Sequence, residues 1–359
     1  MKLVFVTKKL SSLKLTGLSM NSDTIHYRLK KNSTLFFQFR TFWAGSFIFF
    51  ALFCTKPLVH SQYDPQFSQN MFNPVVVNPG YAGNSGMVNL VALDRHQWVG
   101  IEGAPRTTVV GADMGLNLMG NSGGVGLVVM NDEIGFFRNI TIQASLARQI
   151  ILDEGRLGFG IGAGVVNQVF DGTKVELDPG GGGNYHSPDD PLISGVEENG
   201  TALDVGAGVY FSRKNYYGGF SVLHLFEPNP NFDDQLSVYV PRSFFLTAGY
   251  NHHLYQNPII LKPSFFLKQS GGSWQLDLNM NALFNERYWL GLTYRITDAI
   301  VLLGGVELNN GLRVGYSYDI TTSGLGNAGS KGSHEIMVGY QFDISLGRGE
   351  QKYRSVRYL

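Results

Sequence analysis

The chain has 359 residues, with 28 Lys+Arg against 28 Asp+Glu, so its formal net charge is zero and gives no support for nucleic-acid binding. Charged residues make up 16% of the chain, whereas a soluble domain carries about 25%. The 45 glycines, 25 phenylalanines and 17 tyrosines exclude coiled coils, helical bundles and disordered chains. Such a composition is typical of an all-β protein that alternates apolar with small polar residues.

The zero net charge hides a sharp division at the N-terminus. Residues 1–61 carry a charge of +8 and the remaining 298 residues a charge of −8. Basic residues in 28–40 precede an apolar stretch at 41–54, which has the length of a signal-peptide core. We expect cleavage between Ser61 and Gln62, and therefore export. Signal peptides usually run about 15–30 residues, so either translation starts downstream near Met20 or the leader is unusually long.

The only cysteine, Cys54, lies within this predicted leader. Ala51 and Phe53 do not match a lipoprotein signal, so lipidation is not expected. The processed chain would have no thiol, which excludes disulfides, cysteine nucleophiles and cysteine-based metal sites.

From residue 86 onward the sequence repeats one pattern, in which apolar and polar residues alternate with the period of a β-strand. In 274–284, for example, Trp274, Leu276 and Leu278 oppose Gln275 and Asp277. About 14 segments show this pattern: 86–98, 106–114, 123–131, 137–151, 155–170, 202–212, 216–226, 242–254, 259–269, 274–284, 288–296, 299–307, 312–320 and 333–345.

The connectors between these segments differ by parity. The three longest, 171–201, 227–241 and 321–332, all follow odd-numbered segments, whereas most of those after even-numbered segments are tight turns. Outer-membrane barrels have long outward loops and short periplasmic turns. We therefore predict a transmembrane outer-membrane β-barrel of about 14 antiparallel strands, in preference to a soluble sandwich or propeller, whose outward face would be more highly charged.

The predicted organisation has four parts. Residues 1–61 form the leader, 62–85 a periplasmic lead-in, 86–346 the barrel and 347–359 a periplasmic tail. The lead-in contains Asn-Pro pairs that interrupt regular structure. Its aromatic content favours docking into the base of the barrel through Phe67, Met71, Phe72 and Tyr81 over a free linker. Whether this segment or the loops plug the lumen is left open.

Several motifs resemble the PorP/SprF family of outer-membrane proteins, which is tied to type IX secretion and gliding in Bacteroidota. They are DPQFSQNMFNPVVVNPGYAG at 64–83, RHQWVGIEGAPRT at 95–107, GVGLVVMNDEIG at 124–135, SHEIMVGYQF at 333–342 and RSVRYL at 354–359. The resemblance covers essentially the whole processed chain, and the long leader and the Gly-rich loop at 179–201 depart from it.

The resemblance implies a non-enzymatic role in delivering or anchoring large secreted surface proteins such as adhesins. It implies as partners the type IX translocon or periplasmic, peptidoglycan-associated components, the surface-protein cargo and outer-membrane lipid, with no nucleic acid and no cofactor. The residues that it assigns to partner binding are Asp64, Pro65, Phe67, Ser68, Gln69, Asn73, Pro74, Asn78, Pro79, Tyr81, Gly83, Arg95, Gln97, Trp98, Gly100, Gly103, Ala104 and Pro105. Trp98 equally fits an interfacial aromatic belt, and Arg95 is expected at a rim or facing the lumen.

Two other functions are weighed against this one. A passive porin is the first alternative, and a barrel hydrolase is the second and weaker one. Gly120–Gly124 is similar to a serine-protease nucleophile loop, but the spacing of His96, His186, His224 and His252–His253 suggests neither a triad nor a metal site. Loop 171–201 is acidic, yet its carboxylates do not follow a calcium-loop spacing, which favours a solvated loop.

Overall fold

The computed structural model describes residues 64–118, 121–174, 196–231 and 239–343, all within one compact unit, Val59–Leu359. The predicted leader, its cleavage site at Ser61 and Gln62, the tail at 347–359 and most of the acidic loop lie outside the described residues. Within the described ranges no helix is both long enough and apolar enough to cross a membrane.

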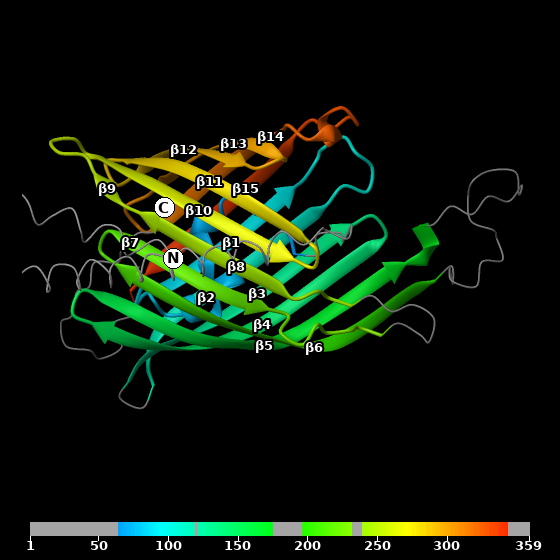
Figure 1. The fold of residues 1–359 in the computed structure, drawn as a ribbon, viewed down its shortest axis with the longest axis horizontal. Coiled ribbons are helices and arrows are strands. Elements are labelled where there is room, and N and C mark those ends of the chain that lie inside the picture. The colour runs from blue at the N-terminus through cyan, green and yellow to red at the C-terminus, as the bar shows by residue number, and fades with distance from the viewer. Residues whose placement is uncertain (1–63, 119–120, 175–195, 232–238, 344–359) are drawn as a thin grey trace, which may run out of the picture. The chain divides into compact units, whose positions relative to one another are not determined.

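Fourteen long antiparallel strands and one two-residue strand form a closed sheet (Figure 1). The ring closes because β15 pairs with β1 as well as with β14. This confirms the predicted antiparallel barrel of about 14 strands. The strands are β1 (Val88–His96), β2 (Arg106–Leu118), β3 (Asn121–Ile134), β4 (Phe137–Leu152), β5 (Gly155–Asp171), β6 (Glu197–Arg213), β7 (Tyr216–Leu223), β8 (Ser243–Tyr250), β9 (His252–His253), β10 (Ile259–Ser270), β11 (Ser273–Phe284), β12 (Tyr288–Arg295), β13 (Ala299–Glu307), β14 (Leu312–Thr321) and β15 (Ser333–Phe342).

The two-residue strand β9 arises from an interruption in a segment predicted to be continuous. Pairing between β10 and β8 stops at Ser264, opposite Gly249, and resumes with β9 at Leu261, opposite His252. Pro263 lies between these points and has no N–H with which to continue the ladder. The backbone N–H of Asn251 donates instead to the carbonyl oxygen of Asn215, at 2.6 Å.

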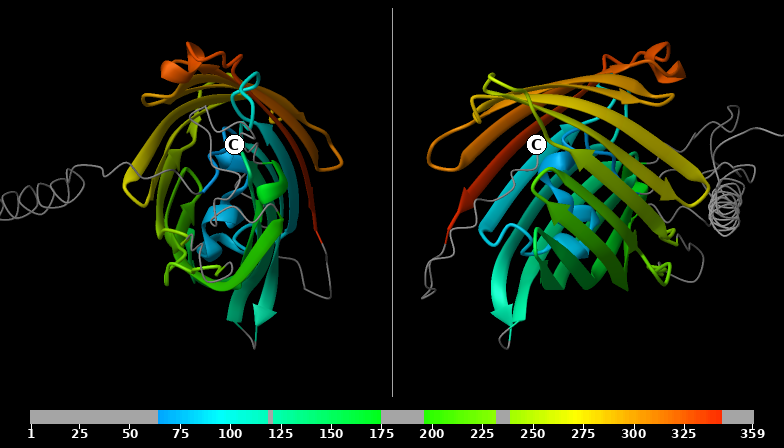
Figure 2. Two further views of the ribbon diagram at one scale, coloured as in Figure 1. Left: turned by 90° about the vertical axis from the view of Figure 1, so that its right-hand side faces the viewer. Right: turned by 60° about the vertical axis from the view of Figure 1, so that its left-hand side comes forward.

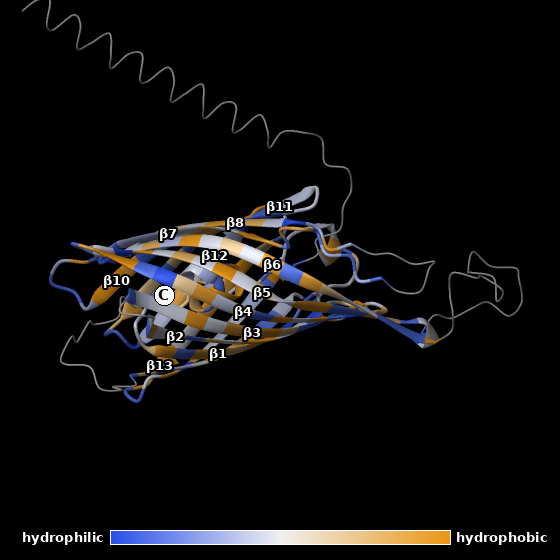
Figure 3. Ribbon diagram, turned by 90° about the horizontal axis from the view of Figure 1, so that it is seen from below, coloured by the Kyte–Doolittle hydropathy of each residue, from blue (hydrophilic) through white to orange (hydrophobic). Residues whose placement is uncertain are grey.

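The two faces of the barrel have the chemistry expected for a wall between lipid and a polar interior. Along β4, Ile142, Leu146 and Ile150 are exposed on the outside, while Gln143 and Gln149 are buried inside. The same alternation follows the other strands, and Figure 3 shows it as orange patches that alternate along the strands with white, grey or blue ones. Because the apolar side chains face outward and the polar ones inward, lipid is the environment that stabilises the outer face.

The connector lengths confirm the prediction that the long connectors lie at one end of the barrel and the short turns at the other. The three longest follow β5, β7 and β14, and we call the end of the barrel that carries them the outer end. Short turns such as 153–154 and 214–215 lie at the opposite, inner end. β6 begins at Glu197, five residues before the predicted start, because residues 197–201 pair with 167–171 of β5. Their sequence is polar throughout and gave no apolar alternation.

Residues 64–85, which we call the plug, fill the interior of the barrel (Figure 2, blue segment). The plug contains three short helical turns, η1 (Asn70–Phe72), α2 (Pro74–Val77) and η2 (Pro79–Tyr81). A proline opens each of the last two, where its missing N–H is not needed. Further short turns, η3 (Gly172–Lys174) and η4 (Gly324–Gly326), follow β5 and β14.

The plug extends further than predicted. Phe67, Met71, Phe72 and Tyr81 are all buried, so they contact the barrel interior as expected. They are not confined to its base, however. Asp64, at the start of the plug, contacts His224 just beyond the outer end of β7 and Lys268 near the outer end of β10. From there the plug runs to the inner end, where β1 starts at Val88.

Candidate functional site

A cluster of five buried charged residues holds the first part of the plug. Glu335 of β15 accepts the backbone N–H groups of Ser68, at 2.8 Å, and Gln69, at 2.7 Å. The hydroxyl of Ser68 donates to Asp319 of β14 at 2.7 Å. The side-chain amide of Gln66 donates to Asp277 of β11 at 2.9 Å. Two backbone donors and two side chains of the plug are therefore satisfied by carboxylates of the barrel wall.

Two arginines neutralise these carboxylates and connect the strands to one another. Arg95 of β1 donates to Asp319 at 2.7 Å and to Glu335 at 3.2 Å. Arg295 of β12 donates to Asp319 at 2.7 Å and to Asp277 of β11 at 3.1 Å. All five side chains are at most 2% exposed, so we call this set (Arg95, Asp277, Arg295, Asp319 and Glu335) the charged cluster. Removing one member would leave an uncompensated buried charge.

A second group of charges fixes the start of the plug. One carboxylate oxygen of Asp64 lies 3.1 Å from Nε2 of His224, and Nδ1 of the same ring lies 2.9 Å from Asp204. Nζ of Lys268 donates to the backbone carbonyl oxygen of Asp64 at 2.7 Å. Burial alone would lower the pKa of His224, but the charges of Asp64 and Asp204 outweigh it and raise that pKa to about 10.

The second part of the plug is held by close steric fit against glycines of the barrel wall. A Cβ atom on Gly160 would lie 2.3 Å from the carbonyl oxygen of Pro79, and one on Gly158 would lie 2.2 Å from that of Gly80. On β3, a Cβ on Gly124 would lie 2.4 Å from the Cα of Gly83. The glycines that alternate along β5 therefore leave the space that the plug backbone occupies.

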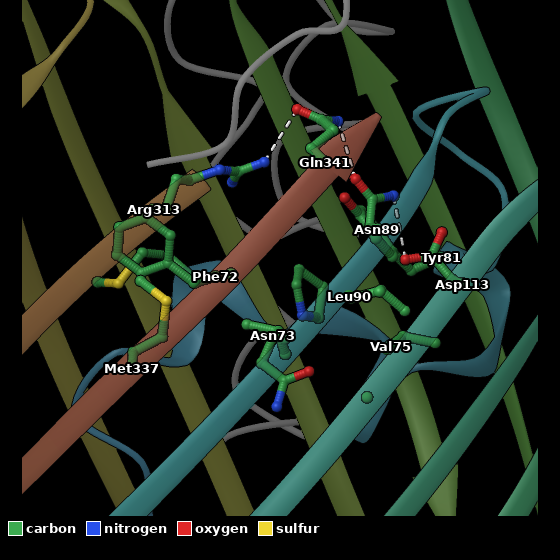
Figure 4. A pocket seen from close by; sticks show the side chains of 15 residues that line it. Phe72, Asn73, Val75, Tyr81, Asn89, Leu90, Asp113, Arg313, Met337 and Gln341 are labelled. Atoms are coloured by element: carbon green, nitrogen blue, oxygen red, sulfur yellow. Dashed lines mark hydrogen bonds between the residues drawn. The ribbon is translucent and has the colours of Figure 1, made fainter. Parts of the chain in front are cut away.

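Aromatic contacts and a polar network complete the packing. Phe72 lies 4.9 Å from Trp289 between ring centroids, and Tyr81 lies 5.0 Å from Tyr210 in an edge-on arrangement. A cavity of about 40 Å³ lies between the plug and the wall, and Figure 4 shows the side chains that line it. Asn89 bridges it by donating to Asp113 and accepting from Gln341. A space of this size has room for a few water molecules at most.

The predicted partner-binding residues fall into two groups. Those of the lead-in and Arg95 lie inside the barrel, all of them buried except the partly buried Pro65 and Pro74: Asp64, Pro65, Phe67, Ser68, Gln69, Asn73, Pro74, Asn78, Pro79, Tyr81, Gly83 and Arg95. The expectation that Arg95 faces the lumen is met. The partner-binding role assigned to these residues stays a prediction.

The second group forms the β1–β2 loop at the outer end. Gly100 and Gly103 are exposed there, while Gln97, Trp98, Ala104 and Pro105 are partly buried. The backbone N–H of Trp98 donates to the hydroxyl of Ser333 at 3.0 Å. The carbonyl oxygen of Gly103 accepts the backbone N–H of Gly135 at 2.9 Å. The loop is thus tied to β15 and to the β3–β4 turn, and its two glycines have positive φ angles.

Sequence reasoning missed most of the residues that hold the plug. Asp277, Arg295, Asp319 and Glu335 were read only as the polar face of their strands, or not singled out at all. Each is a charged residue at an inward-facing position of a strand whose outward-facing positions are mostly apolar. That placement is the signal that would have marked them, because an isolated charge there needs an interior partner.

The candidate catalytic residues are not brought together. His96 lies against Asp94 on the outer surface, and His252 and His253 lie at the inner end. Both ring nitrogens of His224 face carboxylates, so neither is placed to accept a proton from a serine. Ser122 follows the β2–β3 turn, and His186 lies outside the described residues. Within the described ranges, no three His, Cys, Asp or Glu side chains are grouped so as to hold a metal ion.

Comparison with solved structures returns outer-membrane barrels at low similarity. The Ralstonia pickettii toluene transporter TbuX has 10% identity, covers 77% of this chain and 93% of its own, and gives a TM-score of 0.44. The monoaromatic hydrocarbon channel CymD has 11% identity over 81% and 96% of the two chains, also with a TM-score of 0.44. The β domain of the Bordetella autotransporter BrkA has 12% identity over 72% and 99%, with a TM-score of 0.35.

Comparison with the curated proteins gave no match. The family model for "Type IX secretion system membrane protein PorP/SprF" matches residues 59–340, a range that contains the plug and nearly all of the barrel. The chain therefore belongs to the PorP/SprF family of type IX secretion system membrane proteins.

Proposed function

We propose that this protein is a non-enzymatic outer-membrane component of the type IX secretion or gliding machinery that helps to deliver or anchor secreted surface proteins such as adhesins. Membership of the PorP/SprF family supports a role in type IX secretion. The observation that carries the proposal further is the plug. The interior is filled by the chain's own residues, which supports a role for the surfaces at the two ends of the barrel over a role for the lumen as a conduit.

Two separate faces are available for partners. The outer end presents the β1–β2 loop, which hydrogen bonds join to β15 and to the β3–β4 turn. We propose that this face contacts the secreted cargo. The inner end presents short turns, among them 251–258 with the 87%-exposed Tyr255. We propose that it faces translocon or peptidoglycan-associated components, while the buried motif residues act indirectly by holding the plug.

Deletion of the gene followed by proteomics of the cell surface tests this function. We expect one or a few large surface proteins to be lost from the surface and to accumulate in the periplasm, with recovery on complementation by the wild-type chain. A complementing chain that carries Val99→Asp, in the exposed part of the β1–β2 loop, should place a folded barrel in the outer membrane. It should not return the cargo protein to the cell surface. An unchanged surface proteome in the deletion strain would contradict the proposal.

The filled interior also bears on the porin alternative. A passive channel needs a continuous aqueous path, whereas the plug occupies the lumen from near the outer strand ends to the inner end. Liposomes that contain the purified wild-type protein should therefore not swell in isosmotic solutions of small sugars. Swelling comparable to that given by a known porin would favour the channel.

A further inference from the structure

The outward face of the barrel carries one arginine that differs from the others. Four arginines on the described strands point outward. Three of them have a carboxylate partner: Arg106 with Asp94, Arg138 with Glu197 and Arg213 with Glu154. The fourth, Arg148 of β4, has no carboxylate partner among the described residues, and its guanidinium donates only to the amide oxygen of Asn121, at 3.3 Å.

Arg148 lies beside an apolar groove on the same face. The groove follows β6, where the small Ala207 lies between Ile161 of β5 and Val222 of β7. One step along, Val209 lies between Phe159 and Phe220. The larger side chains on both sides form walls around a volume of about 740 Å³, and Asn121, Ser122 and Arg148 line the same space.

The position of the groove on the barrel indicates which kind of molecule covers it. The groove opens on the apolar outer face, which the fold assigns to lipid. Asn121 is the first residue of β3, immediately after the inner β2–β3 turn, so the polar end of the groove lies in the half of the barrel nearest the inner leaflet. A guanidinium that lies beside lipid without a carboxylate partner among the described residues attracts a phosphate oxygen, which it binds with charge-assisted hydrogen bonds.

We propose that this groove binds an anionic phospholipid of the inner leaflet. One acyl chain lies over Ala207 between β5 and β7, and the phosphate accepts hydrogen bonds from Arg148. The side-chain amide of Asn121 orients the guanidinium toward the head group. The site is separate from the plug and from both end faces, so it does not depend on the secretion role.

Lipid binding to the full processed protein in mild detergent tests the site, with native mass spectrometry as the readout. Dioleoyl phosphatidylglycerol and dioleoyl phosphatidylcholine share their acyl chains and differ in head-group charge. We expect the wild-type protein to bind the first about tenfold more tightly. Arg148→Gln should abolish that preference, and Arg148→Lys should retain part of it. Arg138→Gln is the matched control, since that arginine also faces outward but pairs with Glu197, and it should bind as the wild type does.

The apolar part of the site has its own test. Ala207→Phe fills the groove without changing a charge, and it should weaken the binding of both lipids. Heat-modifiable migration on gels establishes that each variant has folded. Equal binding of the two lipids by the wild type, or an unchanged preference in Arg148→Gln, would overturn the head-group assignment. Unchanged binding by Ala207→Phe would overturn the groove as the seat of the acyl chain.

Discussion

The substitution Arg295→Met isolates the contribution of the charged cluster to the stability of the barrel. Arg295 is 1% exposed and contacts both Asp277 and Asp319. Its removal leaves three buried carboxylates in the cluster and one arginine, Arg95, which contacts Asp319 and Glu335 but not Asp277. Breaking a buried ion pair by removing one partner lowers the free energy of unfolding by about 3–5 kcal/mol, and we expect a loss in that range.

Trp289 provides a local signal for this experiment because it packs against Phe72 of the plug. Urea unfolding in detergent can be followed both by tryptophan fluorescence and by heat-modifiable migration. Arg213→Met is the matched control, since its partner is the exposed Glu154 at the inner turn, and such pairs contribute about 0.2–1 kcal/mol. An Arg295→Met variant as stable as Arg213→Met would refute the reasoning.

Three further predictions concern the plug. Gly160→Val places side-chain atoms where the carbonyl oxygen of Pro79 lies and should expel the second part of the plug, giving conductance in planar bilayers. Gly218→Val is its control, because a Cβ there meets nothing closer than 3.6 Å. A Gly160→Val protein that gives no conductance would contradict the steric account. The raised pKa of His224, about 10 against the usual 6.5, contributes stability that is fully present below pH 6.5 and is lost as the pH rises through about 10. Urea midpoints measured from pH 6 to 11 should therefore fall more steeply for the wild type than for His224→Gln, and parallel curves would exclude this role of His224. Deletion of residues 62–85 should convert the non-conducting barrel into a conducting one, provided that heat-modifiable migration shows the variant to be folded. A folded variant that does not conduct would show that other segments fill the lumen.

The wall of the barrel could be predicted from the sequence because lipid on one side and polar groups on the other impose a two-residue period. That period identified all the long strands and the order of their connectors. It did not identify the break at Asn251, which depends on Pro263 in the neighbouring strand. Nor did it extend to residues 197–201, whose pairing with β5 lies in a stretch without apolar residues.

The interior was harder to predict because its contacts join residues that are far apart in the chain. Ser68 and Glu335 are 267 positions apart, and no local pattern relates them. The glycines of β5 were visible as a small-residue face, but only the position of Pro79 and Gly80 explains why a larger side chain is excluded at Gly158 and Gly160. The Asn-Pro pairs correctly marked the plug as irregular, and its aromatic residues correctly marked it as packed.

The ring of strands is joined where the two ends of the sheet meet, and that seam is fastened from within. Arg95 belongs to the first strand of the sheet and Glu335 to the last, and Ser68 and Gln69 contact one or both of them. The earliest described part of the chain thus serves as a clasp between the two terminal strands. The backbone ladder of β1 and β15 and the Arg95–Glu335 ion pair already join this seam. The interior segment adds further hydrogen bonds across it, and a barrel assembled empty would lack that reinforcement.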